Sequence, residues 1–471
     1  MTEAELDKIL QIPSAAIIAP AGHGKTEMIA DIVKHSEGKQ LLLTHTNAGV
    51  DAIEKRLKKR SISKEKYTVT TIAAFCIKWC TSYDSTGNFD KNLSPLNGRE
   101  EAKAYYSQLY LGAKNIFETD WAGNVLKATY TGIVVDEYQD CLQEQHEIIL
   151  AIHKHLPVRV LGDPMQGIFS FAGKLVDWSC LEFPIVDVIT KPWRWYKSNP
   201  ELGEYLMKVR EALLPSLNKR KCSLQINANN SIEIVSPANF TGYSHLKELS
   251  KFSSVVYITK WPQQQLEFCS RMPGVFQYDE KQECDELFKF AELFDNETGA
   301  QLAICVIKFV TECSTGIAKE VKSYIERLKE GSFDFSSLRK HTDFRDILVE
   351  TAPDITKETV LNMLIWFSSS PFFKQYRAEL LSEMIRSVKY AIDNNITIYD
   401  AANHIRKDIG LQKRYTGFKF LSSRTLLSKG LEFDCVIIDM TTPLSAKDFY
   451  VAMTRAMKKI YIIANTNKFE F

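Results

Sequence analysis

The first 75 residues alternate short apolar runs with segments of helical periodicity. Ala15–Ala19 and Gln40–Thr44 are the apolar runs, and their length and composition favour strands. The segments after them carry apolar residues at helical spacing, namely Ile29, Ile32 and Val33 in the first and Val50, Ile53 and Leu57 in the second. Strands that alternate with helices predict a parallel sheet covered by helices.

This alternation stops between about Cys76 and Thr131, where the chain is polar and rich in Tyr and Asn. It returns at Ile133–Val135 and Arg159–Leu161, two short apolar runs that each end in Asp or Gly-Asp. The polar segment therefore reads as an insertion into the first sheet domain.

A second set of strand-like runs begins later, at Ile232–Val235, Val255–Thr259 and Val275–Tyr278. From about Glu280 to Lys413 strand signals nearly vanish, and helical stripes dominate, such as Val321, Tyr324, Ile325 and Leu328. Strand patterns return at Cys435–Asp439 and Ile460–Ala464. We therefore expect a second α/β domain that is interrupted by a helical insertion.

Bulk properties set limits on this picture. A chain of 471 residues suggests about three domains, and 45% hydrophobic with 25% charged residues is typical of a soluble globular protein. The net charge of +1 means that a nucleic acid would have to bind a local basic track. Ten scattered cysteines without a CxxC pair predict reduced thiols. Because the sequence has neither a signal peptide nor a long apolar run, we expect a cytoplasmic location and no membrane contact.

The strongest chemical signal is the segment APAGHGKT at residues 19–26, between an expected strand and an expected helix. Gly22 and Gly24 allow backbone N–H groups to point at phosphate oxygens, with Ala21 and His23 completing the loop. Lys25 would reach the β- and γ-phosphates of a nucleotide, and Thr26 would bind Mg²⁺. The alternative is a glycine-rich turn that only caps a helix.

A second signal lies about 110 residues further on, where IVVDEYQD (133–140) runs from a strand into acids. Beside a phosphate loop one carboxylate can bind Mg²⁺ while its neighbour polarises the attacking water. We assign Asp136 to the metal and Glu137 to the general base. Two acids at a strand end are otherwise simply a solvated turn.

These segments and several others resemble, in order, the motifs of UvrD/Rep/PcrA-type superfamily 1 helicases. The similar segments are LLLTHTNAGVDAIEKRL (41–57), YTVTTIAAF (67–75), LGDPMQGIFSFAG (161–173), TKPWRW (190–195), SKGLEFDCVIID (428–439) and YVAMTRAMKKIYI (450–462). The likeness runs over nearly the whole chain. KGLEF and YVAxTRA are its most specific parts.

The resemblance implies a role for each matching residue. It makes Gln166 a γ-phosphate sensor, Arg194 a phosphate contact and Arg455 the arginine finger. For the nucleotide, Trp193 would stack on adenine, and Gly430 and Glu432 carry over as nucleotide-binding positions. Single-stranded DNA would contact a further set of residues: Thr44, Thr46, Asn47, Thr71, Phe169 and Phe171.

The resemblance also implies the architecture, an α/β fold of two RecA-like parallel-sheet P-loop core domains with two mostly helical insertions. The first core would span 1–75 and 133–185, with a small insertion at 76–132. The second core would span 186–280 and 416–471, with the helical insertion at 281–415. Lys25 would then lie on the first core and Arg194 and Arg455 on the second, so that ATP with Mg²⁺ would clamp the cores together.

Two functions follow from the resemblance. The first is an ATP-dependent translocase and helicase on single-stranded DNA that moves 3′ to 5′. The second is an ATP-driven DNA- or nucleotide-sensing switch that regulates a partner without processive unwinding. The sequence departs from the usual residues at Ala73, Ala172, Pro192 and Leu426, and Ala73, Ala172 and Leu426 favour the second function. No upstream Gln for adenine is evident. The short chain is similar to the helicase halves of Gabija-type antiphage systems, which suggests a separate nuclease as partner.

Overall fold

The computed structural model describes residues 3–90, 92–93, 99–169, 173–187, 191–240, 243–280, 284–411 and 418–471. The chain divides into two compact units. The first unit comprises Met1–Ile226, Ser445–Lys458 and Lys468–Phe471, and the second comprises Asn227–Leu444 and Lys459–Asn467. Each unit is built around one parallel sheet, so the expected architecture of two RecA-like domains with mostly helical insertions is confirmed.

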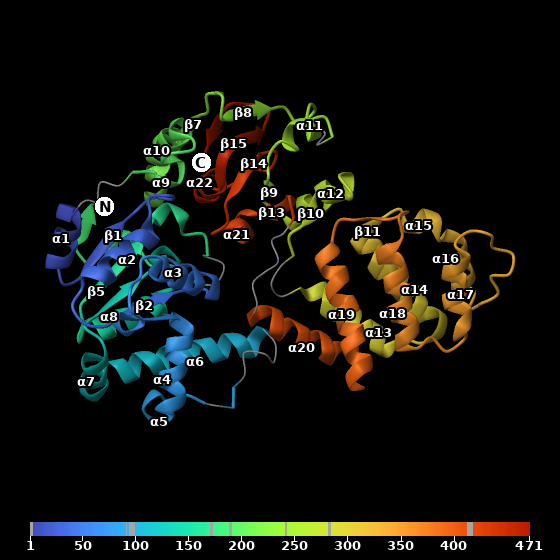
Figure 1. The fold of residues 1–471 in the computed structure, drawn as a ribbon, viewed down its shortest axis with the longest axis horizontal. Coiled ribbons are helices and arrows are strands. Elements are labelled where there is room, and N and C mark those ends of the chain that lie inside the picture. Colours follow the sequence, from blue (N-terminus) through green and yellow to red (C-terminus); the bar gives the residue numbers. More distant parts are fainter. Residues whose placement is uncertain are drawn as a thin grey trace. The chain divides into compact units, whose positions relative to one another are not determined.

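The sheet of the first unit has the strand order β3-β2-β4-β5-β1-β6 among the described residues, and each strand runs parallel to its neighbours. Figure 1 labels three of its strands, β1, β2 and β5. The strands are β1 (Ala15–Ile18), β2 (Gln40–Thr44), β3 (Tyr67–Thr71), β4 (Gly132–Val135), β5 (Val158–Gly162) and β6 (Ile185–Asp187). The four central strands are almost wholly buried, because helices cover both faces of the sheet. Runs of Ala, Ile, Leu and Val are suited to such strands.

Two hydrophobic cores lie against this sheet. One contains buried residues of α1 (Glu3–Gln11), α2 (Lys25–His35) and α3 (Asn47–Lys59), including the predicted Ile29, Ile32, Val33, Ile53 and Leu57. The other contains residues of the predicted insertion and of α8 (Gln143–His153). The insertion is helical: α4 (Ile72–Ser82) is followed by α5 (Asp84–Gly87), α6 (Arg99–Phe117) and α7 (Asp120–Thr129). The sheet is therefore covered as its apolar pattern predicted.

Three further helices complete the first unit and bear on the site. They are α9 (Trp193–Tyr196), α10 (Pro200–Leu213) and α22 (Ala446–Met453). A two-stranded antiparallel sheet pairs β7 (Ser223–Gln225) with β16 (Lys468–Glu470). The compact units thus divide the chain differently from the expected domains, since 186–226 and 445–458 were expected in the second core and lie in the unit of the first sheet.

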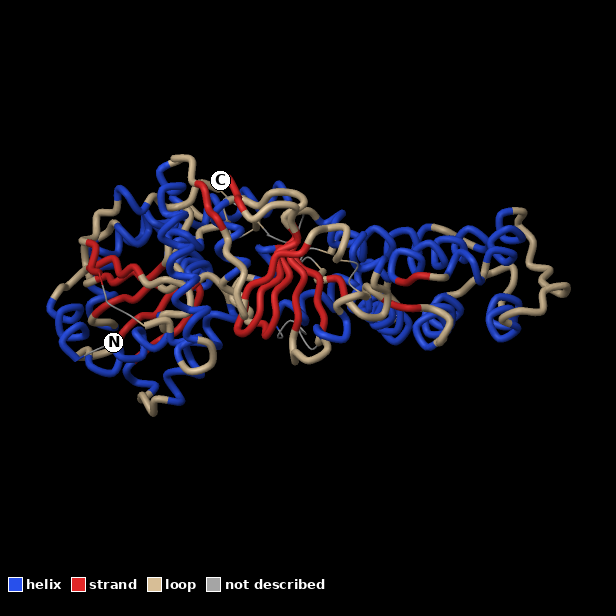
Figure 2. Tube along the Cα trace, turned by 90° about the horizontal axis from the view of Figure 1, so that it is seen from above, coloured by secondary structure: helices blue, strands red, loops and turns tan. Residues whose placement is uncertain are grey.

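The second unit is built on a sheet of order β10-β13-β9-β14-β15-β8, whose strands run side by side in Figure 2. They are β8 (Ile232–Val235), β9 (Val255–Thr259), β10 (Gln277–Tyr278), β13 (Phe420–Arg424), β14 (Phe433–Asp439) and β15 (Ala456–Ile463). Three helices accompany them, α11 (Leu246–Leu249), α12 (Pro262–Arg271) and α21 (Thr425–Ser428). The strands expected at Ile232–Val235 and Val255–Thr259 have those bounds, whereas β15 begins four residues earlier than expected.

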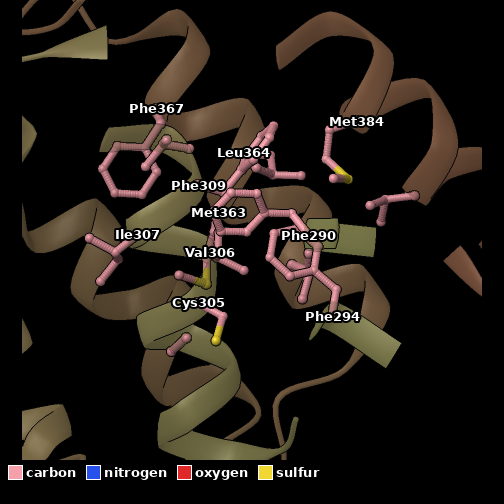
Figure 3. Close-up of a cluster of buried hydrophobic side chains, with 14 of the residues drawn as sticks. Phe290, Phe294, Cys305, Val306, Ile307, Phe309, Met363, Leu364, Phe367 and Met384 are labelled. Atoms are coloured by element: carbon pink, nitrogen blue, oxygen red, sulfur yellow. The ribbon is translucent and has the colours of Figure 1, made fainter. Parts of the chain in front are cut away.

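Helices fill the second unit from Asp285 to Leu411, as the loss of strand signals predicted. They are α13 (Asp285–Asn296), α14 (Gly299–Cys313), α15 (Ile317–Glu320), α16 (Lys322–Lys329), α17 (Thr342–Glu350), α18 (Lys357–Ser369), α19 (Ala378–Asn394) and α20 (Ile398–Leu411), with β11 (Ser314–Thr315) and β12 (Lys374–Gln375) pairing between them. Their core is apolar and rich in Phe and Leu, including Phe290, Phe309 and Leu364 (Figure 3). In a buried ion pair, Nε and Nη2 of Arg377 donate to the two carboxylate oxygens of Glu280 at 2.6 and 2.7 Å. Arg377 directly precedes α19 and Glu280 lies two residues after β10, so the pair connects these two segments.

All ten cysteines lie in described residues and are free thiols, which confirms the prediction from their spacing. Nine of them are buried and Cys180 is exposed. Of the helices in the described ranges, none combines the length and the apolarity that crossing a bilayer requires.

Candidate nucleotide-binding site

The glycine-rich loop joins β1 to α2 at the carboxyl edge of the first sheet. Gly22 and Gly24 have φ angles of +73° and +81°, in the left-handed region that favours glycine. Space requires glycine as well, because a Cβ at Gly22 would lie 2.6 Å from the Trp195 ring and 2.9 Å from Cβ of Arg194. The loop therefore has the backbone of a phosphate cradle, and Thr26 follows it in the first turn of α2.

Lys25 lies between the loop and the acids that follow β4. Its Nζ is 3.5 Å from the carbonyl oxygen of Ala19 and 3.9 Å from Oε1 of Glu137. The acids reach this place because β4, β5 and β1 are neighbours in the sheet and their carboxyl ends meet at one edge. The two strongest sequence signals, about 110 residues apart, thus form one site.

Asp136 has the properties of a cation ligand. Burial raises its pKa to about 7, and the neighbouring carboxylate of Glu137 adds to the rise. A bound cation would offset both causes and keep Asp136 ionised. Among the described residues no group of three or more His, Cys, Asp or Glu could hold a metal by itself. This donor set fits Mg²⁺, which typically takes one or two protein oxygens together with phosphates and water, and Thr26 and Asp136 would hold it here.

Glu137 is held in an unusual conformation. Its φ is +52°, a left-handed value that is rare and costly for a residue with a side chain. Nε2 of Gln139 donates to Oε2 of Glu137, and Oε1 of Gln139 accepts from the backbone N–H of Asp163 at 3.0 Å. The backbone turn and the contact with Gln139 hold the carboxylate of Glu137 at the sheet edge where Lys25 lies, and its role as general base stays a prediction.

Both predicted arginines lie in the unit of the loop. The backbone N–H of Arg194 donates to the carbonyl of Gly22 at 3.1 Å, and its Nη1 donates to the carbonyl of Thr454 at 2.7 Å. Arg455, which is 2% exposed, directs Nη2 to Oε1 of Gln166 at 3.5 Å. The residues that the sequence assigned to the γ-phosphate are therefore connected to the loop in one compact unit, and not divided between the two units as expected.

Trp193 lies beside the loop with an open face. It is 47% exposed, and a Cβ placed on Gly24 would be 3.2 Å from its ring. Tyr196 packs on the ring in a T-shaped pair with centroids 5.4 Å apart. The position fits the expected stacking on a nucleobase, because the ring borders the phosphate loop and is not part of the core.

Three polar residues of this unit were not singled out from the sequence: Asp163, Arg210 and Tyr450. The phenol of Tyr450 accepts the backbone N–H of Ala21 at 3.4 Å, while His23 is buried with Nδ1 2.8 Å from the carbonyl oxygen of Ala21. Burial lowers the pKa of His23, which favours the neutral imidazole. Of these three, Arg210 could have been noticed in the sequence, because it is a cation among the apolar residues that line one face of the helix.

The predicted DNA contacts gather at the same sheet edge, but several have structural roles. Thr44 is buried and pairs in register with Thr71. Thr46 and Thr71 are N-caps, whose hydroxyls accept the backbone N–H groups of Gly49 at 3.0 Å and Ala74 at 3.1 Å. Asn47 is exposed at the start of α3.

Other predicted residues are not placed with this group. Phe169 is partly buried, and Phe171 lies outside the described residues. Gly430 and Glu432 belong to the second unit, where Gly430 has a φ of +83° and Glu432 is exposed. Their part in nucleotide binding stays a prediction.

The family comparison matches part of the first unit. An AAA domain model matches residues 2–172, a range that includes the glycine-rich loop and both acids. Among curated proteins, none matches this sequence.

Several solved helicases share a distant likeness. The Pif1 helicase from Candida albicans is 11% identical with a TM-score of 0.34, over 99% of this chain and 96% of that one. The Arterivirus nonstructural protein 10 helicase, solved with DNA, is 12% identical with a TM-score of 0.34, over 98% of this chain and 63% of that one. The PRRSV helicase is 9% identical with a TM-score of 0.34, over 98% of this chain and 54% of its own. This chain thus spans less than two thirds of these two viral helicases.

Proposed function

We propose that this chain is an ATP-driven motor that translocates along single-stranded nucleic acid, and that DNA is its strand. The observation that carries the proposal is the convergence of Arg194, Gln166 and Arg455 on the unit that holds the phosphate loop. A turn that merely caps a helix needs none of these groups. Phosphoryl transfer does need them, because it depends on positioning and on cations around the γ-phosphate.

The chemistry assigns one task to each group. Lys25 and the loop N–H groups would bind the phosphates, and Mg²⁺ held by Thr26 and Asp136 would neutralise charge on the β- and γ-phosphates. Glu137 would take a proton from the attacking water as its oxygen bonds to the γ-phosphorus and the bond to the ADP oxygen breaks. Arg455 and Arg194 would stabilise the charge on the transferred group.

Movement would arise at the junction between Arg455 and the second sheet. Arg455 directly precedes β15, which begins at Ala456 and is a strand of the second sheet. A shift of Arg455 upon loss of the γ-phosphate would therefore be transmitted along the chain into the second unit. From the resemblance we further propose 3′ to 5′ polarity, the expected residue bounds of the two cores and their insertions, a UvrD-type relationship and a cytoplasmic location.

A second candidate function is a DNA- or nucleotide-sensing ATPase switch that regulates a separate nuclease, as in Gabija-type antiphage defence. Two observations favour it. Ala73 stands where the family usually has His, and Thr46 and Thr71 already serve as helix caps. Strand separation on a forked duplex distinguishes the two functions, because a switch would hydrolyse ATP in response to DNA without unwinding it.

The ATPase rate is expected to rise when short single-stranded DNA is added, and the stimulation is expected to fade as salt increases. The reason is that phosphate contacts release counterions, so that affinity falls steeply with ionic strength. Steady-state ATPase assays with a single-stranded oligonucleotide at several salt concentrations measure this effect. If single-stranded DNA did not change the ATPase rate at low salt, the proposed motor function would be wrong. Double-stranded DNA without ends is the control.

Trp193→Ala is expected to raise the KM for ATP about tenfold and to leave kcat nearly unchanged, since stacking on a base contributes about 1–3 kcal/mol to binding. An aromatic ring stacks on any base, so the ratio of ATP to GTP affinity should stay constant. Fluorescent-nucleotide titration measures both affinities. Trp121→Ala, an exposed tryptophan on α7, is the matched control. Unaltered ATP affinity in Trp193→Ala would show that the ring does not stack on the nucleotide.

A further inference from the structure

Arg210 is a charged residue in an apolar setting. It lies on α10 between buried positions, which include Leu206, Val209 and Leu213, and is itself only 8% exposed. None of the helicase-like segments contains it. Because a buried guanidinium requires a partner, its contacts indicate what the residue does.

The partner of Arg210 is Asp163, which is 0% exposed and follows β5. Nε and Nη2 of Arg210 donate to the same oxygen, Oδ1, at 3.2 and 3.0 Å. The backbone N–H of Met165 also donates to Oδ1, at 3.2 Å, so that Asp163 caps the short helix Pro164–Gln166. One carboxylate oxygen is thus fully engaged by α10 and by the backbone.

The other oxygen of Asp163 sets the direction of Gln166. Oδ2 accepts from Nε2 of Gln166 at 3.1 Å, and the amide oxygen of Gln166 therefore faces Nη2 of Arg455, at 3.5 Å. If the amide were reversed, two donors would face each other at Arg455 and two acceptors at Asp163. Asp163 thus orients the amide of Gln166, and the amide in turn presents its oxygen to Arg455.

Asp163 also lies near the phosphate loop. Burial of Tyr450, and after it the charge of Asp163, raise the pKa of the Tyr450 phenol, whose oxygen accepts the backbone N–H of Ala21 at 3.4 Å. The carboxylate is therefore placed between two parts of the site, Gln166 with Arg455 on one side and Tyr450 with the loop on the other.

We propose that Arg210 is a positioning residue for ATP hydrolysis, which acts through Asp163 to hold Gln166 and Arg455 in the orientation that the γ-phosphate requires. Arg210 does not touch the nucleotide. This inference rests on the proposed ATPase function. The competing explanation is a purely structural ion pair that fastens α10 to the sheet.

The test is a cycle of three variants, Arg210→Gln, Asp163→Asn and both together. Arg210→Gln is expected to lower kcat about 10²-fold, as misplaced catalytic groups do, with the KM for ATP within about threefold of wild type. If Arg210 acts through Asp163, the double variant should have the kcat of Asp163→Asn within about twofold. Lys208→Gln, at an exposed position of the same helix, is the control and should hydrolyse ATP at the wild-type rate.

Three results would contradict the positioning role of Arg210. A folded Arg210→Gln with wild-type kcat, a change in KM alone, or independent effects that multiply in the double variant would overturn the positioning role. If Arg210→Gln does not fold, Arg210→Lys decides, since it keeps the charge beside Asp163 but loses the paired donors. Its kcat should fall about tenfold while its melting temperature stays near that of wild type, and an unaltered kcat would overturn the role. A wild-type chain without ATPase activity would instead refute the proposed function itself.

Discussion

Arg455→Ala is expected to lower the rate of ATP turnover about 10³-fold or more, the usual effect of removing an arginine finger. Its guanidinium contacts the amide oxygen of Gln166, which the resemblance assigns to sensing the γ-phosphate. Charge on the γ-phosphoryl group grows in the transition state, and a preorganised cation stabilises that state more than the bound substrate. The loss should therefore appear in kcat.

Single-turnover ATPase assays with saturating single-stranded DNA measure this effect. Lys458→Ala is the matched control, since Lys458 is exposed on β15 three residues further on. Arg455 also donates from Nε to the carbonyl of Val451 at 3.0 Å, so melting temperatures must show that the variant is folded. A folded Arg455→Ala protein with near-normal kcat would remove Arg455 from the catalytic site.

Glu137→Gln is expected to abolish hydrolysis while ATP binding is retained. Glutamine has the shape of glutamate but cannot take a proton from water, so only the chemical step should be lost. The contact with Gln139 can persist, because the new amide still offers an oxygen to Nε2 of Gln139. We expect the folded protein and the nucleotide affinity to be nearly unaltered.

Fluorescent-nucleotide titration and an ATPase assay on the same sample separate binding from chemistry. Lys25→Ala provides the contrast, since it should lose binding and hydrolysis together. Glu144→Gln, an exposed acid at the start of α8, should behave as wild type. If Glu137→Gln turned over ATP at a normal rate, the general base would have to be another group.

Apolar runs predicted most strands of the two large sheets, and the strands that they missed are either polar or short. The strand β13 contains Ser422 and Ser423, which are buried although polar, so a hydrophobic pattern does not detect them. Threonine makes up most of β3, and β6 has only three residues. The hydroxyl of Ser423 donates to the carboxylate of Asp279, a partner far away in the chain that no local pattern reveals.

The parts of the site that lie within one short segment could be predicted from the sequence, whereas contacts between distant segments could not. The loop with Lys25 and the pair Asp136–Glu137 were found from local pattern alone. The contact between Ala21 and Tyr450 joins positions 429 residues apart, and no local pattern reports it. The same holds for the place of Arg194 and Arg455, because motif order does not say with which sheet α9 and α22 pack.

The burial of nine thiols leaves Cys180, in the first unit, as the accessible cysteine of the chain. Thiol-reactive dyes attack an exposed thiolate and leave buried thiols intact, so this natural residue offers a site for labelling without removal of the other nine. With a donor dye on Cys180 and an acceptor dye on one cysteine introduced into the second unit, the distance between the two dyes could be measured by energy transfer. Energy transfer between the two dyes would then follow the separation of the units through each nucleotide state.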